Sequence, residues 1–161
     1  MIIEYEEKYL NDVRDLLTEL EEYIISIDED ELDQLHPEYW EKMALLSLKE
    51  AYDNEGICYL AIENNKVVGA IIGGIRPYEP YDYLDYKCPK AGEVIELIVS
   101  KDIRGKGIGH KLMDKLESYF KDKGCEYIGI DVFAYNKNAI NFYAREGYHN
   151  RMHRVIKKLE Q

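Results

Sequence analysis

The sequence is poor in the features that mark secreted, membrane-spanning and metal-clustered proteins. Its three cysteines, Cys58, Cys88 and Cys125, are an odd number without paired spacing. This argues against a disulfide framework and a zinc site, and it favours a reducing compartment. The N-terminus lacks the basic and apolar regions of a signal peptide, and no apolar run approaches the roughly 20 residues that span a bilayer. We therefore expect a cytoplasmic protein.

Basic residues are outnumbered by acidic ones. The chain has 21 Lys and Arg against 32 Asp and Glu, for a net charge of −11. A surface this acidic repels nucleic acids and anionic membranes, so neither is expected as a partner. It can attract cationic amines, or it can serve only to keep the protein in solution. The four histidines show no metal-ligand spacing, and no metal is expected.

The 161 residues, 46% of them hydrophobic, predict a single folded domain over residues 1–161. Apolar spacing predicts a helix from Leu10 to about Ile24 and another that begins near Pro37. Further helices are predicted over 108–123 and 136–147, and a tyrosine-rich loop over 76–92. Strand patterns cover 1–5, 57–62, 67–75, 93–99, 127–133 and 148–159. Because strands and helices alternate in the second half, we expect a mixed sheet covered by helices.

The segment RGKGIG, residues 104–109, lies between a predicted strand and a predicted helix. It fits neither a Walker A loop nor a dinucleotide fingerprint, because no glycine in it has the required downstream partners. The first N–H groups of a helix lack internal partners, and glycines let an anion approach them closely. With Arg104 and Lys106 nearby, the segment is suited to a pyrophosphate. The alternative is an ordinary glycine-rich turn.

The surrounding residues resemble motif A of the GNAT acetyltransferase superfamily. That motif is an apolar strand, then Arg/Gln-x-x-Gly-x-Gly/Ala, then a helix, and Arg104, Gly107 and Gly109 match it. A second block resembles the later part of the family. It consists of Asn136, Ala139, Tyr143, Gly147 and Tyr148. The close resemblance covers residues 93–148.

This resemblance implies an α/β (α+β) fold: a mixed, mostly antiparallel sheet of six to seven strands flanked by about four helices. It also implies acetyl-CoA as co-substrate, with its pyrophosphate on backbone N–H groups and its pantetheine arm along a splayed strand end. A backbone N–H near Val99 would stabilise the thioester oxyanion. The implied cofactor-binding positions are Leu97, Ile98, Val99, Arg104, Gly105, Lys106, Gly107, Ile108, Gly109, His110, Asn136, Ala139 and Tyr143.

Transfer of an acetyl group from sulfur to an amine needs a base for the ammonium and an acid for the thiolate. By its match to the family, Tyr143 is expected to be the acid; the alternative is a core aromatic. For the base we rank Glu96 first, then Asp131, then Glu93. Strict alternation would place Glu96 on the face of Val94 and Ile98, with Glu93 on the opposite face. All three carboxylates could also be bystanders, since relatives often work without a dedicated base.

The acceptor is the least determined feature of the sequence. Acidic residues interleave with tyrosines in the loop 76–92, and such a surface could bind a cation or could pack the loop or a dimer contact. Three hypotheses remain: an N-acetyltransferase for a small-molecule amine, an acetyltransferase for a protein or peptide amine, or a non-catalytic acetyl-CoA sensor. The short segment after Gly147 would leave a sheet edge open, which would allow a homodimer.

Overall fold

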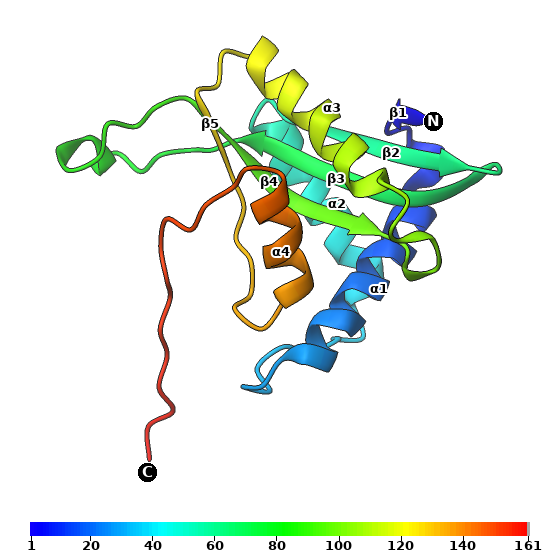
Figure 1. Cartoon of the computed structure of the whole chain (residues 1–161), viewed down its shortest axis with the longest axis horizontal. Coiled ribbons are helices and arrows are strands. Elements are labelled where there is room, and N and C mark those ends of the chain that lie inside the picture. The colour runs from blue at the N-terminus through cyan, green and yellow to red at the C-terminus, as the bar shows by residue number, and fades with distance from the viewer. Residues whose placement is uncertain (161) are drawn as a thin grey trace. The chain divides into compact units, whose positions relative to one another are not determined.

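A five-stranded sheet forms the centre of the computed structural model, which describes residues 1–160 (Figure 1). The strands lie in chain order: β1 (Ile2–Glu4), β2 (Ile57–Glu63), β3 (Lys66–Ile75), β4 (Ala91–Val99) and β5 (Tyr127–Gly129). Neighbours are antiparallel except β4 and β5, which are parallel. The fold class is therefore as expected, but the described residues contain five strands instead of six to seven.

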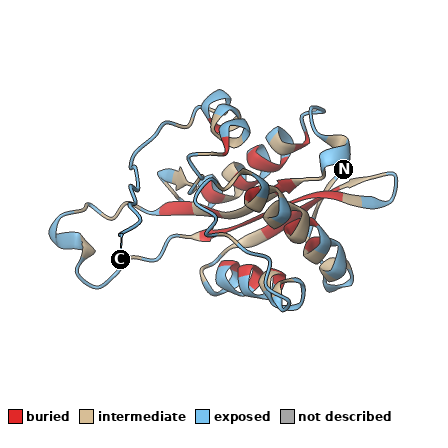
Figure 2. Ribbon diagram, turned by 90° about the horizontal axis from the view of Figure 1, so that it is seen from below, coloured by how far each residue is buried: buried red, intermediate tan, exposed pale blue. Residues whose placement is uncertain are grey.

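Helices cover both faces of this sheet. On one side lies α3 (Ile108–Asp122): a Cβ placed on Gly73 of β3 would meet Leu116 and Phe120 of that helix. On the other side lie α1 (Leu10–Ile27) and α2 (Tyr39–Asp53), and a Cβ on Gly74 would meet Ala51. The buried residues follow the strands and the inner helix faces (Figure 2). The predicted helices thus bury the apolar stripes on which they were predicted.

The two predicted central strands form a hairpin. Asn64 and Asn65 both have positive φ angles, 50° and 61°, as the tight turn between β2 and β3 requires. The short 3-10 helices η1 (Glu7–Tyr9), η2 (Asp82–Leu84) and η3 (Lys101–Ile103) lie in the connections. None of the described helices is both long and apolar enough to cross a membrane.

Two predicted strands differ in the structure. The strand predicted over 127–133 ends at Gly129, and the segment predicted over 148–159 has no regular secondary structure. Met152 and Ile156 would lie on one face of a strand and Val155 and Leu159 on the other, and all four are exposed. Without one apolar face, this segment has little to bury as a strand.

The chain divides into two compact parts, Met1–Asp131 and Val132–Gln161. The first holds the sheet and α1 to α3; the second holds α4 (Lys137–Arg145). Asn136 begins α4 by accepting a hydrogen bond from the N–H of Ala139 (3.1 Å), and Gly147 follows it with a φ of 90°. The expectation of one domain over residues 1–161 stays a prediction.

Candidate active site

A β-bulge in β4 sets the orientation of its acidic side chains. Ile72 of β3 pairs with Glu96, but the next residue, Gly73, pairs with Val94, so Ile95 is an extra residue. Paired residues share a face; Val94 therefore lies on the α3 side with Gly73, and Glu93 lies on the α2 side with Gly74. The expectation from strict alternation was therefore wrong: Val94 does not share a face with Glu96. Instead, Glu93 and Glu96 both face α2.

The second half of β4 has an open edge. β5 pairs with β4 only from Ala91 to Glu93, and no described residue forms a strand beside Val94–Val99 on that side. The N–H of Ser100 donates to the carbonyl of Val68 on β3 (2.9 Å). By alternation, the backbone of Ile98 also faces β3, whereas the N–H and C=O of Leu97 and Val99 face the open edge. Of the three backbone positions expected there, two thus present their polar groups.

The open edge leads directly into the glycine-rich segment. Gly107 is the N-cap of α3 with a φ of 74°, and Gly105 has a φ of 82°, a region that side chains disfavour. A Cβ on either glycine would meet no atom within 4 Å, so these glycines serve the backbone conformation and leave the approach open. The backbone N–H groups at the start of α3, such as those of Ile108 and Gly109, come before the first N–H that can bond four residues back within the helix. This arrangement fits a pyrophosphate.

The polar side chains of this segment and of the first turn of α3 have partners of their own. Lys106 lies 3.8 Å from the carboxylate of Glu63, and His110 lies 3.1 Å from that of Asp114. Arg104 turns back toward β4, where its Nε donates to the carbonyl of Val99 (3.0 Å). The sequence did not indicate this contact.

Glu96 is partly buried, and its carboxyl group lies against α2. Its Oε1 accepts a hydrogen bond from the hydroxyl of Ser47 on α2 (2.9 Å), and Ser47 is itself buried. The pKa of Glu96 is raised to about 7: burial has the largest effect, the Ser47 hydrogen bond opposes it, and the charges of Glu21 and Glu50 add to it. A carboxyl group with this pKa can both accept and release a proton near neutral pH.

The other two candidate bases lie close to each other. The carboxylate of Glu93 lies over Gly129 of β5, and burial raises its pKa, as does the neighbouring charge of Asp131. Arg76 opposes that rise and Glu50 adds to it. Asp131 itself is exposed. The structure thus places Glu93 and Glu96 on the α2 side of β4 and Asp131 near Glu93, where the carboxylates would favour a cationic ligand.

In the second part of the chain, Tyr143 is buried on α4. Its ring packs against those of Phe142 and Tyr148, with centroids 5.1 and 5.6 Å apart. Burial raises its pKa above that of a free phenol, so the hydroxyl stays protonated at neutral pH. Asn136 uses its side-chain oxygen to cap α4. Contacts of these residues and Ala139 with a cofactor stay predictions.

The model of the acetyltransferase (GNAT) family matches residues 11–148. The chain belongs to this family. An uncharacterised N-acetyltransferase of Methanocaldococcus jannaschii is 37% identical over 94 residues, which are 58% of this chain and 53% of that protein. The chain spans about half the length of the curated relatives it matches.

Solved structures resemble this GNAT chain over its whole length. The BH1408 protein of Bacillus halodurans has a TM-score of 0.77 at 19% identity, and the match covers 99% of each chain. An aminoglycoside N-acetyltransferase solved in complex with CoA has a TM-score of 0.65 at 16% identity, covering 100% of this chain and 99% of that one. At such low identities, these structural similarities show the fold alone.

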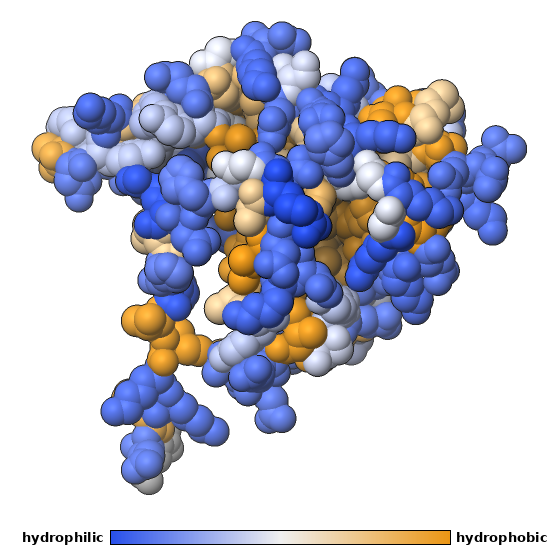
Figure 3. Space-filling view, viewed as in Figure 1, coloured by the Kyte–Doolittle hydropathy of each residue, from blue (hydrophilic) through white to orange (hydrophobic). Residues whose placement is uncertain are grey.

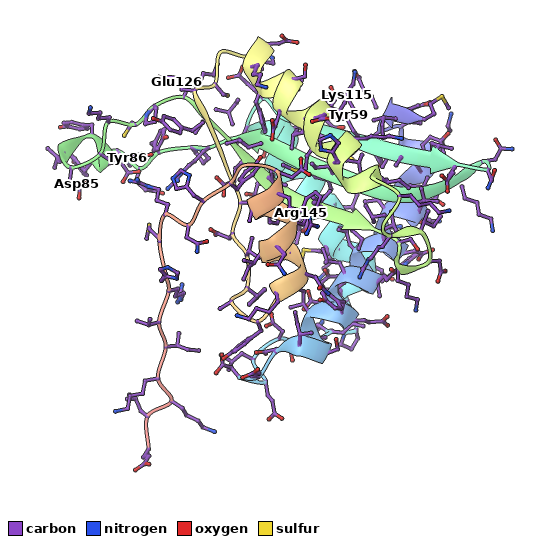
Figure 4. All side chains as sticks on the ribbon, in the orientation of Figure 1. Tyr59, Asp85, Tyr86, Lys115, Glu126 and Arg145 are labelled. Carbon is purple, nitrogen blue, oxygen red and sulfur yellow. The ribbon has the colours of Figure 1, made fainter. Side chains whose placement is uncertain are left out.

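This GNAT chain also carries an arm, residues 76–90, that leaves the sheet between β3 and β4 (Figure 1). At its root, Tyr78 donates to the carbonyl of Pro89 (2.6 Å), and its ring packs 5.8 Å from that of Tyr86. Asp85 and Tyr86 mark the arm in Figure 4, and most of it is hydrophilic, with an apolar end (Figure 3). The tyrosines predicted to pack the loop or to bind cations thus divide between a fixed root and an exposed tip.

Sequence reasoning missed several residues around Glu96. Ser47 lies within the buried stripe of α2, between Ala44 and Leu48. Its only signal in the sequence is that a polar residue interrupts an apolar stripe. Glu21 and Tyr39, which interact with each other, come from α1 and α2. Tyr39 has its pKa raised by burial and by the charges of Glu21 and Glu96. Only the packing of these helices on β4 brings them together.

Proposed function

We propose that this GNAT protein is an acetyl-CoA-dependent N-acetyltransferase that moves an acetyl group to a primary amine by direct attack. The observation that carries the proposal is the open edge of β4, which joins an anion cradle to a buried carboxyl group on the same strand. Backbone N–H groups from Gly105 to His110, with Lys106, would hold the pyrophosphate, Leu97 would pair with the pantetheine arm, and the N–H of Val99 would face the thioester oxygen. Acetyl-CoA supplies the thioester.

Glu96 is the proposed base. An alkyl ammonium has a pKa of about 10.4, so only a small fraction is neutral and nucleophilic at pH 7. A carboxyl group whose pKa is about 7 is a better proton acceptor than an ordinary glutamate and is still largely ionised at slightly alkaline pH. Asp131 and Glu93 are the alternatives, acting directly or through water. In each case the proton leaves the amine before or as nitrogen attacks.

Tyr143 is the proposed acid. The departing thiolate needs a proton, and a buried phenol keeps its own at neutral pH. This role requires the hydroxyl to reach the thiol sulfur in the complex. It is tested by Tyr143→Phe, which keeps the ring packing against Phe142 and Tyr148 and removes only the hydroxyl.

The proposed acceptor is a small cationic amine, because Glu21, Glu50, Glu93 and Glu96 surround the same side of β4. A protein or peptide amine is the second candidate, favoured by the exposed tyrosines of the arm, Tyr81 and Tyr83. A small-amine enzyme should release thiol with free amines, whereas a protein acetyltransferase should modify only its partner. A sensor module would bind acetyl-CoA and transfer nothing.

Calorimetric titration with acetyl-CoA tests the cradle. We expect binding by the wild type and none by Gly107→Glu, which places a carboxylate at the anion site. Gly124→Glu is the matched control, because Gly124 lies just beyond the other end of α3, also has a positive φ (78°), and is equally open. Absence of binding by folded wild-type protein, or equal loss in both variants, would refute the cradle. A panel of amines scored by thiol release would then identify the acceptor.

A further inference from the structure

The side chain of Arg104 contacts the end of β4, although the residue belongs to the glycine-rich segment. Its Nε donates to the carbonyl of Val99 (3.0 Å), and its guanidinium carbon lies 5.4 Å from the ring centroid of Tyr23 on α1. Its Nη2 is 3.9 Å from Oε1 of Glu19, also on α1. Three partners thus orient the guanidinium toward the strand and α1.

Glu19 also contacts the turn that follows β4, at Ser100 and Lys101. Its Oε1 accepts from the backbone N–H of Lys101 (2.6 Å), and its Oε2 lies 3.5 Å from the hydroxyl of Ser100. The turn after β4 is therefore held by a carboxylate on the N–H of Lys101 and by a guanidinium on the carbonyl of Val99, the last residue of the strand. Charge-assisted hydrogen bonds of this kind are stronger than neutral ones.

We infer that Arg104 is a positioning residue that fixes the Val99 peptide at the open edge, and that it does not act as a ligand of the pyrophosphate. This inference rests on the proposed function. The N–H and C=O of one strand residue point to the same side. By binding the carbonyl of Val99, Arg104 therefore also fixes the N–H that would stabilise the thioester oxyanion. A donor that is well aimed before the reaction contributes most to catalysis.

The two roles can be separated with two acetyl donors. S-acetylpantetheine has the thioester and the pantetheine arm of acetyl-CoA but no pyrophosphate. For Arg104→Ala we expect kcat to fall by a similar factor with both donors, on the order of tenfold to a hundredfold for a misplaced catalytic group. Arg104→Lys keeps the charge but lacks the Nε donor, and it should not restore the rate.

Two lysine variants serve as comparisons. Lys106→Ala should raise KM for acetyl-CoA. It should leave KM for S-acetylpantetheine unchanged, because that donor has no pyrophosphate. Lys121→Ala removes an exposed cation near the far end of α3 and should affect neither donor. An Arg104→Ala defect confined to acetyl-CoA, or full rescue by Arg104→Lys, would overturn the inference.

A measurement without substrate keeps this inference distinct from the proposed function. In the ligand-free protein, Arg104→Ala should speed amide hydrogen exchange at Ser100 and Ile103, whose N–H groups are bonded to Val68 and Ser100. Lys106→Ala should not. Unchanged exchange in Arg104→Ala would overturn the positioning role. If the wild-type protein used neither donor, yet Arg104→Ala still sped exchange at Ser100 and Ile103, the proposed function would fail and the positioning contact would stand.

Discussion

Replacing Glu96 with glutamine should make the protein more stable at alkaline pH while it abolishes most of the activity. The side chain is largely withdrawn from water, and its pKa is raised from 4.5 to about 7 in the fold. That difference means that keeping Glu96 ionised in the folded state costs about 3 kcal/mol. Glutamine has nearly the same shape, can accept the Ser47 hydrogen bond through its oxygen, and carries no charge.

The sign of the effect follows from the raised pKa. The folded protein holds the Glu96 proton more tightly than the unfolded chain does. Its contribution to stability is therefore fully present below pH 4.5 and is lost as the pH rises through about 7. The advantage of Glu96→Gln should accordingly be small in acid and should level off above neutral pH.

Urea unfolding at about pH 5.5 and about pH 8.5 measures this difference. The stability of Glu96→Gln relative to wild type should increase by about 2 kcal/mol between the two conditions. Glu126→Gln is the control, because the same substitution is made at an exposed carboxylate at the start of β5 (Figure 4). If the stability of both variants relative to wild type depends on pH in the same way, the fold does not raise the pKa of Glu96 and the reasoning fails.

Activity should change in the opposite direction. If Glu96 is the base, its removal should lower kcat by about 10²–10⁴, the usual contribution of a general base. In the wild type, kcat/KM should fall as the pH drops below about 7. A variant that gained stability and kept its activity would show that Glu96 is buried but not used, and Asp131 or Glu93 would become the candidate.

Three further results are expected. Ser47→Ala removes the hydrogen bond that lowers the pKa of Glu96, so the acid limb of kcat/KM should move to higher pH; an unmoved limb would separate Ser47 from the base. Tyr143→Phe should lower kcat by about 10²-fold or more while KM for acetyl-CoA stays the same; unchanged thiol release would instead favour a core aromatic. Gly92→Ala places a Cβ 2.3 Å from the ring of Phe120 and should cost about 1–3 kcal/mol in urea unfolding, as overpacked cores do.

Features that depend on local sequence were predictable. The Asn64–Asn65 turn needs only positive φ angles, and the turn before α3 needs only glycines between a strand and a helix, so both turns could be derived before the fold was known. That the second turn binds a pyrophosphate stays a prediction. The bulge at Ile95 could not. Period-2 alternation assumes an uninterrupted ladder, whereas the interruption arises from the register with β3.

Because of that bulge, two carboxylates that alternation would separate now face the same helix. A protein interior disfavours a charged carboxylate, and the charges of Glu21 and Glu50 add to the cost at Glu96. Ser47 offsets part of this cost with one hydrogen bond, but a pKa of about 7 for Glu96 shows that the compensation is incomplete. An apolar residue in its place would pack against α2 without that cost. The destabilisation of the ionised Glu96 is what raises its pKa to the value that a proton acceptor near pH 7 requires. For this reason Glu96 ranks above Asp131, whose side chain is exposed, as the candidate base.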